Sequence, residues 1–98
     1  MKSVKVTYTV KPSFVEQNKA NINVFINELK ESGNTDVRYS IYLGEDGRTF
    51  THISLYSSET AQEQFLDMPS FKAFQQQRDE SGLEAEPSIE VLNFVAGV

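Results

Sequence analysis

The chain has no cysteine and no tryptophan, and it holds a single histidine and three prolines among its 98 residues. Without cysteine it can form neither a disulfide framework nor a site for thiolate metal or redox chemistry. One histidine leaves little from which to build a metal centre, so we expect no metal site. That histidine, His52, is also the only side chain whose ordinary pKa lies near neutrality.

Basic residues are scarce as well, with 9 Lys and Arg against 14 Asp and Glu and a net charge of −5. Nucleic-acid-binding domains normally carry a basic stripe, so we expect no nucleic-acid partner. No apolar run approaches the roughly 20 residues that a membrane-spanning helix needs, and the N-terminus alternates like a strand where a signal peptide would carry an unbroken apolar block. We therefore expect one soluble, cytoplasmic domain over residues 1–98 with no membrane partner.

The first half of the chain predicts a strand followed by a helix. Apolar residues alternate with polar ones from Val4 to Val10, and Pro12 ends the strand. Ser13 and Glu16 have the spacing of a capping box, which predicts a helix that begins near Phe14. Its buried stripe consists of Val15, Ile22, Phe25, Ile26 and Leu29. Gly33 suits the left-handed position after the helix.

The second half predicts two strands, a broken helix and a last strand. Residues 37–43 and 48–56 alternate on either side of the turn Gly44–Gly47 and predict a hairpin. Ser57 or Ser58 caps the next helix, which Pro69 must interrupt, and a final strand spans residues 88–96. The order β-α-β-β-α-β predicts an α+β, ferredoxin-like fold with a four-stranded antiparallel sheet and both helices on one face.

The other face of that sheet has no helix to cover it. On the third strand we expect Thr51, Ile53 and Leu55 to face the core. The uncovered face would then hold Lys5, Thr7, Thr9, Arg38, Ser40, Tyr42, Phe50, His52, Ser54, Tyr56, Leu92 and Phe94. Aromatic residues gathered in this way form an exposed apolar patch, which two sheets can bury face to face around a cavity. The sequence therefore predicts a homodimer in the form of an α+β barrel.

The segment QEQFLDMPSFKAF, which follows a third strand running into a Ser- and Glu-rich helix start, resembles the antibiotic biosynthesis monooxygenase family of dimeric α+β barrels. The resemblance implies cofactor-free oxidation of phenolic polycycles or quinols, or haem degradation in one branch. The family commonly has a glutamate and a tryptophan two residues apart where this chain has Ser54 and Tyr56. It commonly has a histidine in the next helix where this chain has Phe65.

The haem-degrading branch uses an asparagine in the first strand, the tryptophan and a histidine late in the second helix. The corresponding positions here are Lys5, Tyr56 and the run Gln75–Gln77. None of these residues supplies an imidazole to bind iron, so we expect no haem and no other cofactor.

Oxygenation without a cofactor requires the protein to deprotonate a phenol or enol, hold the anion and exclude water. We assign His52 as the candidate catalytic base, because of its pKa and its place among aromatic residues. The candidate substrate-binding residues are Arg38 (or Lys5) for the anion, Tyr42, Ser54 and Tyr56 for hydrogen bonds, and Phe50 and Phe94 for the apolar wall. The alternative is a non-catalytic homodimer that binds a ligand or a partner, in which His52 and the tyrosines only stabilise an interface.

Overall fold

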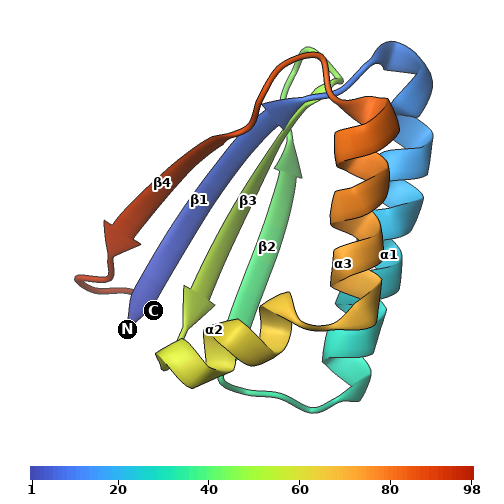
Figure 1. Cartoon of the computed structure of the whole chain (residues 1–98). Coiled ribbons are helices and arrows are strands. Elements are labelled where there is room, and N and C mark those ends of the chain that lie inside the picture. The colour runs from blue at the N-terminus through green and yellow to red at the C-terminus, as the bar shows by residue number, and fades with distance from the viewer.

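The computed structural model describes residues 1–98, which form a twisted four-stranded sheet with helices packed on one side (Figure 1). The elements are β1 (Lys2–Thr9), α1 (Val15–Glu31), β2 (Val37–Leu43), β3 (Thr49–Tyr56), α2 (Glu59–Leu66), α3 (Pro69–Gln77) and β4 (Ser88–Asn93). A 3₁₀ turn, Pro12–Phe14, precedes α1, and a π-helical turn, Arg78–Gly82, follows α3. The strands lie in the order β2-β3-β1-β4, and every neighbouring pair is antiparallel. The ferredoxin-like prediction is confirmed.

Most helix boundaries follow from local sequence signals. The Oγ of Ser58 accepts a hydrogen bond from the backbone N–H of Ala61 at 3.1 Å, which caps α2 as predicted. Pro69 starts α3 as a separate helix, because its ring cannot continue α2. Gly33 ends α1 with a φ of 67°, a conformation that favours glycine. The predicted capping box at Ser13 is wrong: no side chain caps α1, which continues directly from the 3₁₀ turn.

The predicted faces of β3 are also wrong, and they are the reverse of those observed. Residues paired across antiparallel strands share a face, and His52 pairs with Val6 of β1 and Ile41 of β2. These partners belong to the apolar, helix-covered side of the sheet. The alternate residues of β3 on that side, Phe50, His52, Ser54 and Tyr56, are each no more than 4% exposed. The uncovered face of β3 instead carries Thr51, Ile53 and Leu55.

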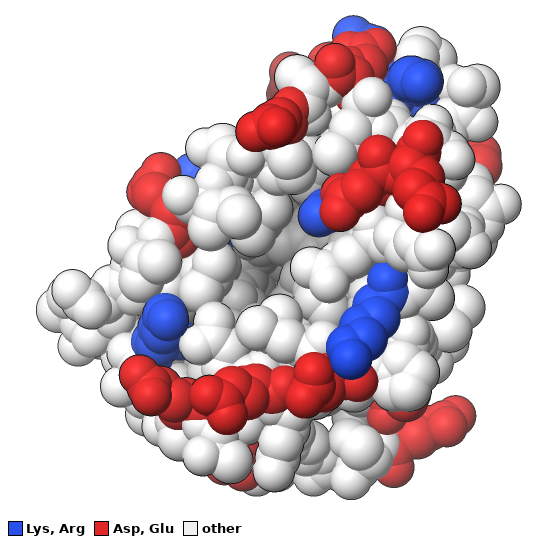
Figure 2. Space-filling model, in the orientation of Figure 1, with Lys and Arg blue, Asp and Glu red and all other residues white.

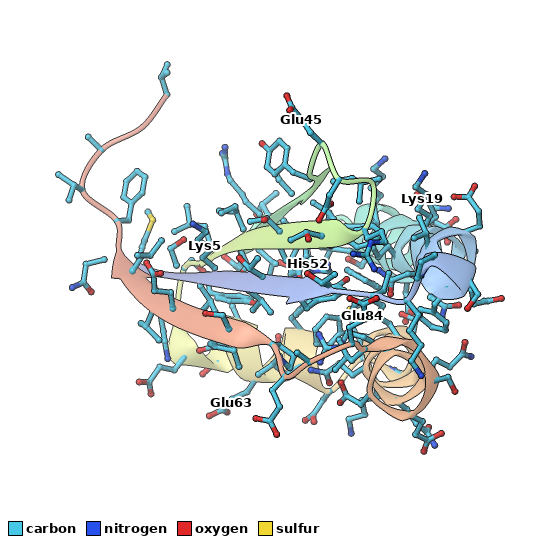
Figure 3. The ribbon with its side chains drawn as sticks, turned by 90° about the horizontal axis from the view of Figure 1, so that it is seen from above. Lys5, Lys19, Glu45, His52, Glu63 and Glu84 are labelled. Carbon is cyan, nitrogen blue, oxygen red and sulfur yellow. The ribbon has the colours of Figure 1, made fainter.

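Aromatic rings dominate the core between the sheet and the helices. Phe25 of α1 lies edge-on to Phe65 of α2 and to Phe71 of α3, with ring centroids 6.1 and 5.1 Å apart. Phe74 of α3 stacks on His52 at 5.5 Å. Such edge-to-face and offset contacts add to the stabilisation from burial. The three helices therefore meet over the centre of β3, where His52 lies near the middle of the molecule (Figure 3).

The helix layer does not extend over β4, which forms one edge of the sheet (Figure 1). Ile89 and Val91 point to the helix side, because they pair with Val6 and Val4, yet they remain 68% and 62% exposed. The last strand ends at Asn93 and not at Ala96 as predicted, and the remaining tail leaves the sheet (Figure 3). No helix combines the length and the apolar character that crossing a membrane would require.

Candidate functional site

A cavity of about 160 Å³ opens between the sheet and the helices α2 and α3, beside the uncovered edge strand. Its wall is formed by Val4, Val6, Tyr39, His52, Ser54, Tyr56, Gln62, Leu66, Phe71, Phe74, Gln75, Arg78, Pro87 and Ile89. Figure 2 shows the surface hollowed at this place, between the strands and α3. The cavity exists because the helices cover β1 and β3 but stop short of β4.

His52 is held at the cavity wall by two tyrosines from the neighbouring strands. The hydroxyl of Tyr8, on β1, lies 2.7 Å from the Nε2 of His52, and the hydroxyl of Tyr39, on β2, lies 2.8 Å from its Nδ1. Asn18 of α1 is fully buried, and its Nδ2 donates to the hydroxyl of Tyr8 at 2.9 Å. Four side chains from four elements thus form one hydrogen-bonded chain that ends at the cavity.

Burial keeps this chain of groups uncharged. It lowers the pKa of His52 from its usual 6.5 to about 3, and the positive charge of Arg78 adds to the effect. Burial also raises the pKa of Tyr8 to about 12, against the opposing effects of the Asn18 hydrogen bond and of Arg78. The pKa of Tyr39 is raised further, again mainly by burial. His52 is therefore a neutral imidazole at physiological pH, and a weak base.

Arg78 is the only lysine or arginine in the wall of the cavity. Its guanidinium lies over the rings of Tyr8 and Phe74, with the central carbon 5.1 and 5.4 Å from the ring centroids. Its Nε donates to Asp79 at 3.0 Å, and its two terminal nitrogens have no hydrogen-bond partner within the chain. Only 8% of the residue is exposed, and the carboxylate of Asp79 balances part of its charge, so an anionic ligand would bind through the terminal N–H groups.

The predicted site residues divide between the two faces of the sheet. His52, Ser54 and Tyr56 line the cavity, and Phe50 lies behind it, stacked on Tyr8 at 5.6 Å. Arg38, Tyr42 and Phe94 are on the opposite face and do not join them, and neither does Lys5, the alternative to Arg38. The reason is that the two faces of β3 were predicted the wrong way round. The predicted site therefore combined residues of β3 from the covered face with residues of the other strands from the uncovered face.

Arg38 and Phe94 do border a second hollow, of about 470 Å³, between the end of the sheet and the C-terminal tail. It is wider than the first, but it contains no buried titratable group and no hydrogen-bonded network comparable to that at His52. We therefore place the candidate site in the smaller cavity under the helices.

Sequence analysis missed Tyr8, Asn18, Tyr39 and Arg78 as site residues. Asn18 did carry a signal, because it lies three residues after Val15 and four before Ile22, on the buried stripe of the helix. A polar residue at such a position needs a buried partner. Tyr8 and Tyr39 lie at alternating positions of their strands, where an aromatic residue needs no polar partner, and Arg78 follows three consecutive glutamines that give no sign of a buried cation.

The residues of the cavity do not offer a metal or haem site. No group of three or more His, Asp or Glu side chains gathers anywhere in the chain. Both ring nitrogens of the single histidine already have tyrosine partners, so iron binding by His52 would break one of these buried hydrogen bonds. The donor set does not fit haem.

Comparison with solved structures shows the same fold in several proteins of low sequence identity. A structure described as an antibiotic biosynthesis monooxygenase superposes with a TM-score of 0.83 at 10% identity, over 98% of this chain and 100% of that one. Rv0793 from Mycobacterium tuberculosis gives 0.82 at 18% identity, over 98% and 96% of the two chains. A conserved protein from Methanosarcina mazei Go1 superposes with a TM-score of 0.79 at 19% identity, over 93% of this chain and 89% of that one.

No protein-family model matches the sequence, and no curated protein matches it either. At these identities the structural likeness establishes the fold and not the activity. The fold implied by the segment Gln62–Phe74 is confirmed: this chain has the fold of the antibiotic biosynthesis monooxygenase structures.

Proposed function

We propose that the protein is a cofactor-independent monooxygenase that oxidises a small phenol or enol in the cavity between the sheet and the helices. The observation that carries this proposal is a partly enclosed aromatic cavity that contains one largely buried cation, Arg78. In the same wall the hydroxyl of Tyr39 is hydrogen-bonded to the imidazole of His52. Sites for small molecules combine apolar walls with a few placed polar groups in this way. Relatives by fold that are described as monooxygenases support the reaction class.

The size of the cavity favours a substrate with one ring. An apolar protein cavity of about 150 Å³ is large enough to hold benzene. The cavity here, at about 160 Å³, is of the same size, and a polycyclic phenol would require the side chains around it to move. The ring would lie against Phe71 and Phe74, with its oxygen toward Arg78 and Tyr39.

The reaction balances without an added reductant. A phenol reacts with O₂ so that the carbon para to the hydroxyl becomes a carbonyl and the original hydroxyl becomes the second carbonyl of a quinone. One oxygen atom of O₂ enters the ring, and the other leaves as water with the hydroxyl hydrogen and the displaced ring hydrogen. All four electrons come from the substrate, which must react as its electron-rich anion.

The proposed role of His52 differs from the base expected from the sequence. A neutral imidazole whose pKa is about 3 is a poor proton acceptor from a phenol. We propose instead that the substrate enters already ionised, that Arg78 holds its oxygen, and that His52 orients Tyr39. This role limits the substrates to enols and phenols that are acidic enough to ionise near neutral pH.

The proposal is tested by following oxygen consumption with a panel of acidic single-ring phenols and enols, together with three-ring phenols. The background oxidation of each compound without protein is subtracted. We expect oxidation of single-ring anions only, and a loss of about 10²-fold or more in kcat/KM for Arg78→Met, which keeps an unbranched apolar stem but removes the charge. Lys72→Met, on the exposed side of α3, is the matched control. No oxygen consumption with any compound would reject the activity.

A second candidate function, ligand binding without catalysis, is favoured by one observation. No residue in the cavity wall combines an accessible position with a pKa near neutrality, because the only histidine is buried and doubly hydrogen-bonded. Saturable binding of the same anions, with no oxygen consumption above background, would select this function. Arg78→Met would then weaken binding without any change in a reaction rate.

A further inference from the structure

When the hydroxyl of Tyr8 donates its proton within the buried chain Asn18–Tyr8–His52–Tyr39, two arrangements of the protons are possible. The hydroxyl of Tyr8 has two partners within hydrogen-bond distance, Asn18 and His52, and it has one proton to donate. A neutral imidazole carries one N–H, so it donates to one tyrosine and accepts from the other. The partner to which Tyr8 donates therefore decides which ring nitrogen of His52 carries the proton, and whether Tyr39 accepts from His52 or donates to it.

In the first arrangement, Asn18 donates its amide N–H to Tyr8, and Tyr8 donates its proton to the Nε2 of His52. The Nδ1–H of His52 then donates to the hydroxyl oxygen of Tyr39, which leaves the proton of Tyr39 free. In the second, the amide of Asn18 is turned over and its oxygen accepts from Tyr8. Nε2–H of His52 then donates to Tyr8, and Tyr39 uses its own proton on Nδ1.

The surroundings of Asn18 favour the first arrangement. As placed, only its Oδ1 is buried without a partner, and no other buried side-chain nitrogen or oxygen in the chain lacks one. Turning the amide over would let that oxygen accept from Tyr8, but it would take from Nδ2 the one hydrogen-bond partner that it has in the chain. Unpaired buried N–H groups are rarer in proteins than under-used carbonyl oxygens.

We propose that Asn18 is a positioning residue which, through Tyr8 and His52, holds the hydroxyl of Tyr39 as a hydrogen-bond donor to the anionic oxygen of a phenolate or enolate bound beside Arg78. The ligand class in this statement rests on the proposed function. The direction of the hydrogen bonds rests only on the contacts of the four side chains.

The position of Tyr39 agrees with this role. Tyr39 and His52 both line the cavity, whereas Tyr8 and Asn18 lie behind them. The hydroxyl of Tyr39 has no partner in the chain other than the Nδ1 of His52. When that nitrogen supplies the proton, the O–H of Tyr39 has no acceptor until a ligand oxygen arrives.

The ligand oxygen would then meet two complementary groups. Tyr39 offers a neutral O–H, and Arg78 offers terminal N–H groups that have no partner within the chain. Donors placed in advance around a desolvated charge favour the anion over the neutral phenol. The cavity would therefore select a ligand that is already ionised.

The first test is the tautomer of His52, read from two-bond ¹H–¹⁵N correlations of the ring. With one histidine in the chain, the signals need no assignment. We expect the wild-type protein to carry the proton on Nδ1 at pH 7–9. Asn18→Asp replaces the amide donor with a carboxylate acceptor of the same shape, so at pH 9 the proton should move to Nε2. A wild-type ring protonated at Nε2, or an unchanged tautomer in Asn18→Asp, would overturn the proposal.

The second test measures binding of 4-nitrophenolate by its visible absorbance. Tyr39→Phe removes only the donor, and it should weaken binding by about 10- to 100-fold, as expected for a hydrogen bond to a charged group. Asn18→Asp should weaken binding too, whereas Tyr42→Phe, on the uncovered face, should not. Equal affinity of the Tyr39→Phe and wild-type proteins would overturn the proposal and leave the proposed function standing. If no phenolate in the panel binds, both the proposed function and the proposed role of Tyr39 toward a ligand fail. The tautomer of His52 would still show in which direction the hydrogen bonds from Asn18 to Tyr39 run.

Discussion

His52 shows how burial changes the chemistry of a residue. Its ring is 2% exposed, stacks on Phe74 and has a tyrosine hydroxyl at each nitrogen. Taking an imidazolium out of water is unfavourable, and neither tyrosine compensates with a negative charge, since burial raises the pKa of both. A histidine that is suited to act as a base in water is therefore held neutral here.

We expect the ring C–H signals of His52 to remain unshifted between pH 8 and pH 5 in the folded protein. The same signals in urea should titrate near the usual value of about 6.5. Proton NMR of the single histidine measures both. A titration midpoint between pH 6 and 7 in the folded protein would contradict the buried, neutral state.

The same pKa shift makes the free energy of unfolding depend on pH. The folded pKa of His52 lies below the unfolded value, so between about pH 6.5 and 3 the unfolded chain binds more protons. The contribution of His52 to the free energy of unfolding should be at its full value above pH 6.5. As the pH is lowered, this contribution should fall by up to about 1.4 kcal/mol per pH unit. Urea unfolding of the wild-type and His52→Gln proteins, from pH 8 to 4, should give a steeper loss for the wild type.

At the scale of the elements, the π-helical turn Arg78–Gly82 connects α3 to the edge strand and sets the position of Arg78. The turn is held against the N-terminal half of the chain, because Lys11 donates its backbone N–H to the carbonyl of Gly82 at 2.8 Å. Gly82 lies flat against the ring of Phe14. A side chain at Gly82 would occupy the space of that ring, with a Cβ 2.6 Å from its Cε2 and 2.9 Å from its Cγ.

Gly82→Ala should therefore destabilise the protein by about 1–3 kcal/mol, the usual cost of overpacking. The cause is contact and not backbone strain, since only Gly33 and Gly47 have positive φ. Thermal and urea unfolding measure the loss. Combining Gly82→Ala with Phe14→Leu should cost less than the sum of the two single changes. Strict additivity would show that the ring is not what excludes a side chain.

At the scale of the whole molecule, the uncovered sheet face remains without a partner. We propose, as the sequence suggested, that a second copy of the chain covers it. On this face Thr51, Ile53 and Leu55 replace Phe50, His52, Ser54 and Tyr56, while Tyr42 and Leu92 stay in place. Phe94 lies beyond β4, in the tail that borders the end of this face. On this face Ile53, Leu55, Leu92 and Tyr42 lie among hydroxyl side chains, with Lys5 and Arg38 of one sign and Glu90 of the other to pair across a two-fold axis.

Light scattering at micromolar concentration should report a particle of two chains, each of 11.1 kDa. Ile53, which pairs with Lys5 and Ser40 at the middle of the sheet, is the position at which to disrupt it. Ile53→Glu should give a folded monomer in which the signals of His52 are unchanged. A monomeric wild-type protein would reject the interface.

The sequence by itself determined the order of the elements and several of their ends, because these depend on neighbours along the chain. Pro69 had to break the helix, Ser58 could cap it, and Gly33 could take the left-handed turn, whatever the rest of the fold. From the order β-α-β-β-α-β the ferredoxin-like fold followed as well.

Only the tertiary structure decided which face of β3 the helices cover, because both faces of this strand carry apolar side chains and alternation cannot rank them. One signal in the sequence did bear on it. The predicted turn Gly44–Gly47 pairs odd-numbered residues of β2 with even-numbered residues of β3. The observed pairs, such as Leu43 and Phe50, follow the same rule about a centre between Asp46 and Gly47. The site itself joins side chains from β1, α1, β2 and β3, and the distances among them arise only when the sheet and the helices pack together.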